Sequence, residues 1–115
     1  MTTVLKVWQT PTARRKLKEI YRYSCKKWGR EVAKEYLADM AQAIKKAATE
    51  AGGKKKNAEF STRFSYSLAR RHYIFFEVRE DKLVVATIFH TAMQVKERLV
   101  EESAVIDREI DKLEN

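Results

Sequence analysis

Two apolar runs decide the fold: His72-Tyr73-Ile74-Phe75-Phe76-Glu77-Val78 and Leu83-Val84-Val85-Ala86-Thr87-Ile88-Phe89. Both are rich in β-branched and aromatic residues, which is typical of strands. The charged stretch Arg79-Glu80-Asp81-Lys82 between them predicts a tight hairpin turn. A further strand is expected at 64–68, where apolar and polar residues alternate. Residues 62–90 therefore predict three antiparallel strands.

Two helices are predicted before these strands. Apolar residues recur at helical spacing over 13–28 and again over 33–47, and Gly29 lies between the two patterns. Thr10 or Thr12 is expected to cap the first helix, because Pro11 fits only a strand exit or a first helical turn. The two helices are expected to form a hairpin.

Shorter patterns complete the chain at both ends. Val4-Leu5-Lys6-Val7-Trp8 predicts a strand that pairs with one of the other three, and two glycines with three lysines at 51–57 predict an exposed loop. Apolar residues at helical spacing over 95–113 predict a final helix of about 20 residues that docks on the body, with self-association as the second use. The expected class is α+β in the order β-α-α-β-β-β-α. A twisted, mostly antiparallel sheet would carry the helical hairpin on one face, with a C-terminal helix.

The charge of the 115-residue chain is divided unevenly. The net charge is +8, but residues 1–93 carry 20 basic and 9 acidic side chains, whereas residues 94–115 carry 4 basic and 7 acidic ones. A chain of this length forms one core. We expect a basic body over 1–93, within a domain over 1–99, and an acidic C-terminal helical extension over 100–115. A body of charge +11 favours an acidic protein or a nucleic acid as partner.

Several classes of protein are excluded by simple counts. One cysteine allows no disulfide framework, and two histidines 18 residues apart with Cys25 on another element do not form a zinc site. There is no glycine-rich phosphate loop and no G-x-S-x-G motif. No apolar run reaches the length of a membrane span, and no signal sequence is present. We expect an unexported protein of the cytosol with no metal, no cofactor and no membrane partner.

Basic and aromatic side chains gather on the predicted sheet. A metal-free ribonuclease needs a base, an acid and a cation beside the scissile phosphate, and these residue types are present. Its candidate catalytic residues would be Arg63, Arg71, His72 and His90. The structural alternative is a sheet core with a rim of solvated arginines. The first helix holds eight basic residues between Arg14 and Arg30, which fit either a docking or phosphate-contacting ridge or a solvated face.

Short motifs in the same order resemble the RelE/ParE superfamily of toxins, and specifically its ParE branch. Ala13, Leu17, Glu19 and Ile20 look like the A-x-x-x-L-x-[DE]-I pattern of its first helix, followed by Trp28-Gly29 and then by Ala33 and Tyr36. His72-Tyr73-Ile74-Phe75-Phe76 is similar to its H-x-I-F-Y strand, and Ile88-Phe89-His90-Thr91-Ala92-Met93 to its I-L-H-x-x-M strand end. Arg63 stands near the family's arginine on the second strand. The resemblance covers residues 4–99.

The sequence departs from the family pattern at four places. Phe76 replaces a tyrosine, Thr87 an arginine and Gln94 an aspartate, and Arg70-Arg71 stand where a glycine is common. These departures concern the active surface more than the fold. They permit a third possibility beside the two active branches, which is an inactivated member kept for antitoxin binding.

The resemblance implies the toxin of a bacterial type II toxin–antitoxin module, acting in the cytoplasm. ParE-type toxins inhibit DNA gyrase, stabilise its cleaved-DNA complex and block replication without turnover. The implied antitoxin is ParD-like, acidic and of the ribbon-helix-helix type, and operator DNA is bound only through the complex. The alternative is a RelE-like endoribonuclease that cuts mRNA on the ribosome. In that case the protein would be a metal-free enzyme.

Two sets of contact residues follow from this resemblance. The residues expected to contact the target are Arg63, Arg71, His72, His90 and Met93. The residues expected to contact the antitoxin, on the helical hairpin and an apolar floor beside it, are Arg14, Leu17, Tyr21, Arg22, Trp28, Tyr36 and Phe75.

Overall fold

The computed structural model describes residues 4–49, 55–56, 59–61 and 63–114. It contains four strands and three helices in the predicted order. These elements are β1 (Lys6–Gln9), α1 (Pro11–Trp28), α2 (Arg30–Thr49), β2 (Ser65–Ala69), β3 (His72–Arg79), β4 (Lys82–His90) and α3 (Val95–Glu114). The α+β class, the element order and the 20-residue final helix are confirmed. Most of the loop predicted at 51–57 lies outside the described residues.

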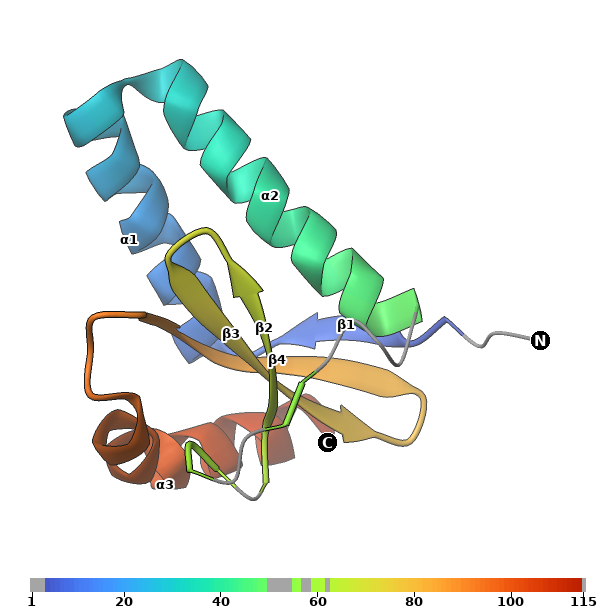
Figure 1. Cartoon of the computed structure of the whole chain (residues 1–115). Helices are drawn as coiled ribbons and strands as arrows, with labels where there is room; N and C mark the ends of the chain where they lie inside the picture. Colours follow the sequence, from blue (N-terminus) through green and yellow to red (C-terminus); the bar gives the residue numbers. More distant parts are fainter. Residues whose placement is uncertain (1–3, 50–54, 57–58, 62, 115) are drawn as a thin grey trace.

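The strands form one mixed sheet in the order β1-β4-β3-β2 (Figure 1). β2, β3 and β4 pair antiparallel, as predicted, while β1 pairs in parallel with β4 over Lys82–Val85. The hairpin of α1 and α2 covers one face of the sheet, and α3 covers the other. β1 pairs only with Lys82–Val85, so within the described residues no strand pairs with the second half of β4 on the side of β1. α1 takes that place, because it follows β1 after only one residue.

The start and end of α1 are set by residues that the sequence marks. The Thr10 hydroxyl accepts the backbone N–H of Ala13 at 3.0 Å and donates to the carbonyl of Ala86 at 2.7 Å, so one side chain both caps the helix and joins it to β4. Gly29 ends the helix with φ 93° and ψ 166°, a conformation almost restricted to glycine. The next helix begins at Arg30, which fixes the hairpin.

The two faces of the sheet form two separate cores. Met40, Ile74 and Phe76 belong to the core under the hairpin, whereas Phe75 and Ile106 belong to the core under α3. Alternation along β3 sends Phe75 to the opposite face from its neighbours. The apolar floor predicted beside the hairpin therefore does not include Phe75, which is completely buried beneath α3.

A register shift in the sheet turns one polar side chain toward α3. Phe75 pairs with Thr87 and Phe76 with Val85, so Ala86 is an extra residue in β4. Ala86 packs in the core under α3, and the Thr87 hydroxyl donates to Glu102 of that helix at 2.9 Å. This bulge explains how a threonine is accommodated within an otherwise apolar strand.

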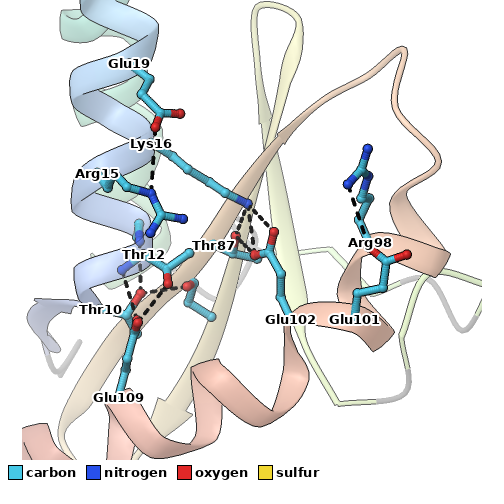
Figure 2. A network of polar contacts seen from close by, with 12 residues as sticks. Thr10, Thr12, Arg15, Lys16, Glu19, Thr87, Arg98, Glu101, Glu102 and Glu109 are labelled. Atoms are coloured by element: carbon cyan, nitrogen blue, oxygen red, sulfur yellow. Dashed lines mark hydrogen bonds and ion pairs between the residues drawn. The ribbon is translucent and has the colours of Figure 1, made fainter.

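The acidic side chains of α3 hold that helix on the basic body. Glu109 accepts both the backbone N–H and the hydroxyl of Thr12, at 2.9 and 2.8 Å (Figure 2). The first turn of α1 contains no acidic residue, so Glu109 supplies the negative charge that favours a helix N-terminus. Asp107 pairs with Arg63, and Glu114 pairs with Arg79. Some of the acidic side chains of the C-terminal segment thus make contacts with the rest of the same molecule.

Candidate functional site

An open groove lies where α1, α2 and the ends of β3 and β4 meet. Its volume is about 1030 Å³. Its walls are the second half of α1 and the start of α2 on one side, and the first half of α3 on the other. The lining residues are Lys16, Glu19, Ile20, Tyr23, Ser24, Lys27, Trp28, Val32, Tyr36, Arg70, Arg71, His72, Ile88, Phe89, His90, Met93, Arg98 and Glu102.

A continuous row of aromatic rings runs along one wall of this groove. Tyr23 contacts Trp28 edge-on at 6.2 Å between ring centroids, and Trp28 lies nearly parallel to Tyr36 at 6.4 Å. Tyr36 contacts His72 at 5.6 Å, and His72 contacts His90 at 5.1 Å. Tyr23 and Trp28 are 59% and 48% exposed, whereas Tyr36 is buried. The outer end of the row therefore offers exposed ring surface, and the inner end is fixed by packing.

His72 is held neutral in the middle of this row. Its Nδ1 lies 2.7 Å from the Tyr36 hydroxyl, which also accepts the backbone N–H of Arg71 at 3.3 Å. Burial lowers the pKa of His72 from 6.5 to about 4, and the neighbouring His90 adds to the effect. The neutral imidazole can accept the hydroxyl proton at Nδ1, which places its own proton on Nε2. At neutral pH this side chain is a hydrogen-bonding group without charge.

Lowering the pH from about 6.5 to about 4 is expected to destabilise the protein through His72. In that window the unfolded chain binds a proton at His72 that the folded chain does not, so the free energy of unfolding falls with the pH. His72→Gln removes this contribution. Urea unfolding of both proteins across the window measures it. The expected result is a shallower pH dependence for the variant, and equal slopes for the two proteins would contradict it.

The floor of the groove contains a partly buried ammonium group. Lys16 donates from Nζ to Thr87 Oγ1 at 2.7 Å and to both oxygens of Glu102 at 2.9 Å (Figure 2). The same Nζ lies 3.8 Å from the centre of the Phe89 ring. Burial lowers the pKa of Lys16, and the bonds with Glu102 oppose that shift. Lys16, Thr87 and Glu102 thus tie α1, β4 and α3 together. In the sequence Thr87 stands out only as a departure from the family pattern, and nothing in the sequence marks Lys16 or Glu102.

The predicted target-contact residues are brought together with one exception. Arg71, His72, His90 and Met93 all line the groove. They come from the β2–β3 turn, the start of β3, the end of β4 and the connection between β4 and α3. Arg63 lies elsewhere. Its guanidinium is bound by Glu77, near the end of β3, and by Asp107 of α3. The four residues proposed for a ribonuclease therefore do not meet at one site.

The predicted antitoxin-contact residues fall into three places. Trp28 and Tyr36 line the groove together with the target-contact residues. A separate shallow depression on the outer side of the hairpin contains the other helical residues, and Phe75 is buried. The depression is lined by Arg14, Leu17, Lys18, Tyr21, Arg22 and Leu37.

The β2–β3 turn explains one departure from the family pattern. Arg70 adopts φ 54°, a left-handed conformation in which glycine is favoured. Its guanidinium pairs with Asp39 at 2.6 Å and lies 5.1 Å from the centre of the Tyr36 ring. These contacts stabilise an arginine where the backbone favours glycine, and they place its charge at the rim of the groove.

Neither a metal-ligand cluster nor a membrane-spanning helix is present among the described residues. They contain no group of three histidine, cysteine, aspartate or glutamate side chains that could hold a metal ion. Within the same residues, none of the helices is long and apolar enough to cross a membrane.

Comparisons with known proteins agree with this fold. The family model for the ParE toxin of the type II toxin–antitoxin system parDE matches residues 7–95. A solved chain of the chromosomal ParDE TA system from P. aeruginosa has a TM-score of 0.66, covers 77% of this chain and 98% of its own, and is 15% identical. No curated protein matches the sequence. Because the family model spans most of the chain, the chain belongs to the ParE toxin family and is the toxin component of a type II toxin–antitoxin system.

Proposed function

We propose that this toxin inhibits DNA gyrase and blocks replication by stabilising the cleaved-DNA complex of that enzyme. The observation that carries the proposal is the groove, in which Arg71, His72, His90 and Met93 meet on a rigid support of paired strands. A surface that acts by binding needs exposed side chains that a partner can cover, and it does not need a general acid and a general base close together. Met93 and Trp28, 41% and 48% exposed, supply apolar anchors of this kind.

The geometry favours this function over an RNA endonuclease. A general acid must give up a proton near neutral pH, but the pKa of His72 is lowered to about 4. Arg63, the cation proposed for the scissile phosphate, is bound by two carboxylates on the other face of the sheet. Both features fit a toxin that acts by binding.

The neutralising partner is proposed to be an acidic, ParD-like antitoxin. Its extended segment would contact Arg14, Leu17, Tyr21 and Arg22 on the hairpin and then enter the groove at Trp28 and Tyr36. Because the groove also holds the target-contact residues, an antitoxin bound there would cover the surface that gyrase needs. Capture would be fast, since a body of charge +11 steers an acidic chain toward it. The site of action would be the bacterial cytoplasm.

Purified gyrase and a supercoiled plasmid test the proposed target. Adding the toxin is expected to produce linear DNA in proportion to its dose. A ribosome with a programmed mRNA serves as the parallel assay. Intact plasmid together with mRNA cut at the A site would instead assign the protein to the ribonuclease branch, and no effect in either assay would indicate an inactive member that binds antitoxin.

Charge reversal on the outer depression is expected to weaken antitoxin binding. In Arg14→Glu/Arg22→Glu, two exposed cations become anions that repel an acidic segment, so we expect affinity to fall at least tenfold at low salt. The salt dependence of binding should fall as well. Calorimetry at two ionic strengths measures both, with Arg108→Glu on the outer side of α3 as control. Unchanged affinity and salt dependence would show that this part of α1 is a solvated face.

A further inference from the structure

We propose that the groove also binds a single strand of DNA, so that the toxin contacts the DNA as well as the protein of the gyrase complex. This inference rests on the proposed function and adds a second partner to the same site. It concerns the outer part of the groove, formed by Tyr23, Lys27, Trp28, Arg70 and Arg71, which we call the ring–cation strip.

The exposed rings of the strip suit the faces of nucleic acid bases. Trp28 and Tyr23 are about half exposed, on consecutive turns of α1. Tyr36 lies nearly parallel to Trp28, at an interplanar angle of 12° and 6.4 Å between ring centroids, so the two rings have nearly the same orientation. Stacking on such rings is the main contact that proteins make with unpaired bases, and it tolerates any base sequence.

Each ring of the strip has a cation next to it. Lys27 Nζ lies 5.2 Å from the centre of the Trp28 ring and 5.5 Å from that of Tyr23. The guanidinium of Arg70, which is also paired with Asp39, lies 5.1 Å from the Tyr36 ring, and Arg71 is exposed on the same turn. Rings with adjacent cations match the alternation of base and phosphate along one strand. An acidic peptide would match the cations and could pack apolar side chains on Trp28, but only nucleic acid supplies both a ring and an anion in every repeating unit, so the pattern favours nucleic acid.

A contact with DNA would also explain how a toxin stabilises a cleaved complex. A ligand shifts an equilibrium only by binding one state more tightly than the other. Bases next to a strand break are less constrained than bases in an intact duplex. A groove that stacks such bases gains contacts in the cleaved state alone, and this difference opposes religation.

The test is direct binding of the full-length toxin to fluorescein-labelled oligothymidylate of about 20 nucleotides, followed by fluorescence anisotropy without gyrase. Trp28→Leu keeps an apolar side chain but loses the ring, and we expect it to weaken binding by about tenfold. Trp28→Phe should retain most of the affinity. Arg71→Ala should weaken binding and reduce its salt dependence, whereas Arg108→Ala removes the same charge from the outer side of α3 and should not. Circular dichroism verifies that each variant is folded.

The outcomes separate this inference from the proposed function. Equal binding by Trp28→Leu and the wild type, or displacement of the oligonucleotide by polyglutamate as readily as by unlabelled DNA, would overturn the DNA site. Plasmid cleavage by gyrase without oligonucleotide binding would also overturn it and leave the gyrase proposal standing. Oligonucleotide binding that depends on Trp28, without gyrase cleavage, would support the DNA site and contradict the gyrase target.

Discussion

A chain that ends at Leu99 is expected to lose its cooperative unfolding transition. The truncation removes Ile106 and Ile110, which are completely buried against the sheet. Replacing one such residue by alanine typically costs about 2–5 kcal/mol, and a domain of this size is stable by only about 5–15 kcal/mol. The cut also removes Glu109 from the N-terminus of α1. The acidic extension over 100–115 thus completes the core of the toxin domain.

Thermal unfolding followed by near-ultraviolet circular dichroism tests this expectation. A matched control ends at Leu113. Among the ion pairs of the described residues it loses the one between Glu114 and Arg79, which should change the stability by less than about 1 kcal/mol. Ile106→Ala and Ile110→Ala give graded intermediates. A chain of residues 1–99 that unfolds cooperatively near the wild-type temperature would show that 100–115 is a dispensable appendage.

Breaking the ion pair in the groove floor is the second large effect that we expect. Glu102→Leu leaves the Lys16 ammonium with Thr87 as its remaining hydrogen-bond acceptor, and the Lys16 side chain is only 15% exposed. Removing one partner of a buried pair costs about 3–5 kcal/mol, and the partial exposure of Glu102 places our expectation near 2–3 kcal/mol. The double variant Lys16→Met/Glu102→Leu should recover most of this loss, because no uncompensated charge remains.

Urea unfolding of the wild type, both single variants and the double variant gives the coupling energy. Glu101→Leu is the matched control, since Glu101 is the next residue and forms an exposed pair with Arg98 at 3.7 Å. We expect it to change the stability by less than about 0.5 kcal/mol. Equal effects of Glu101→Leu and Glu102→Leu would mean that the floor of the groove does not depend on this pair.

Most of the fold could be predicted because its elements carry strong local patterns. The helical spacing of apolar residues gave both hairpin helices and α3, and the turn at 79–82 separates two strands rich in β-branched residues. The parallel pairing of β1 could not be predicted. It depends on where α1 and α2 return the chain, and the spacing of side chains within Lys6–Gln9 does not record that.

The candidate site could be predicted only in part. Strand alternation already places Phe75 opposite His72, so its burial under α3 was recoverable from the sequence. Motif position predicts Arg63 as a target-contact residue beside His72 and His90, but the carboxylates that bind it come from β3 and α3. Thr87 gave a signal as a polar residue inside an apolar strand, whereas its partners Lys16 and Glu102 lie 71 and 15 residues away.

We propose that the groove is the surface through which this ParE-family toxin acts on gyrase. The most direct measurement is the fraction of linear plasmid formed by purified gyrase with the wild type, with Arg71→Glu in the groove and with Arg108→Glu on the outer side of α3. We expect linear DNA with the wild type and Arg108→Glu, and its loss with Arg71→Glu. Linear DNA formed equally by all three proteins would contradict the groove as the active surface, and no linear DNA with the wild type would contradict gyrase as the target.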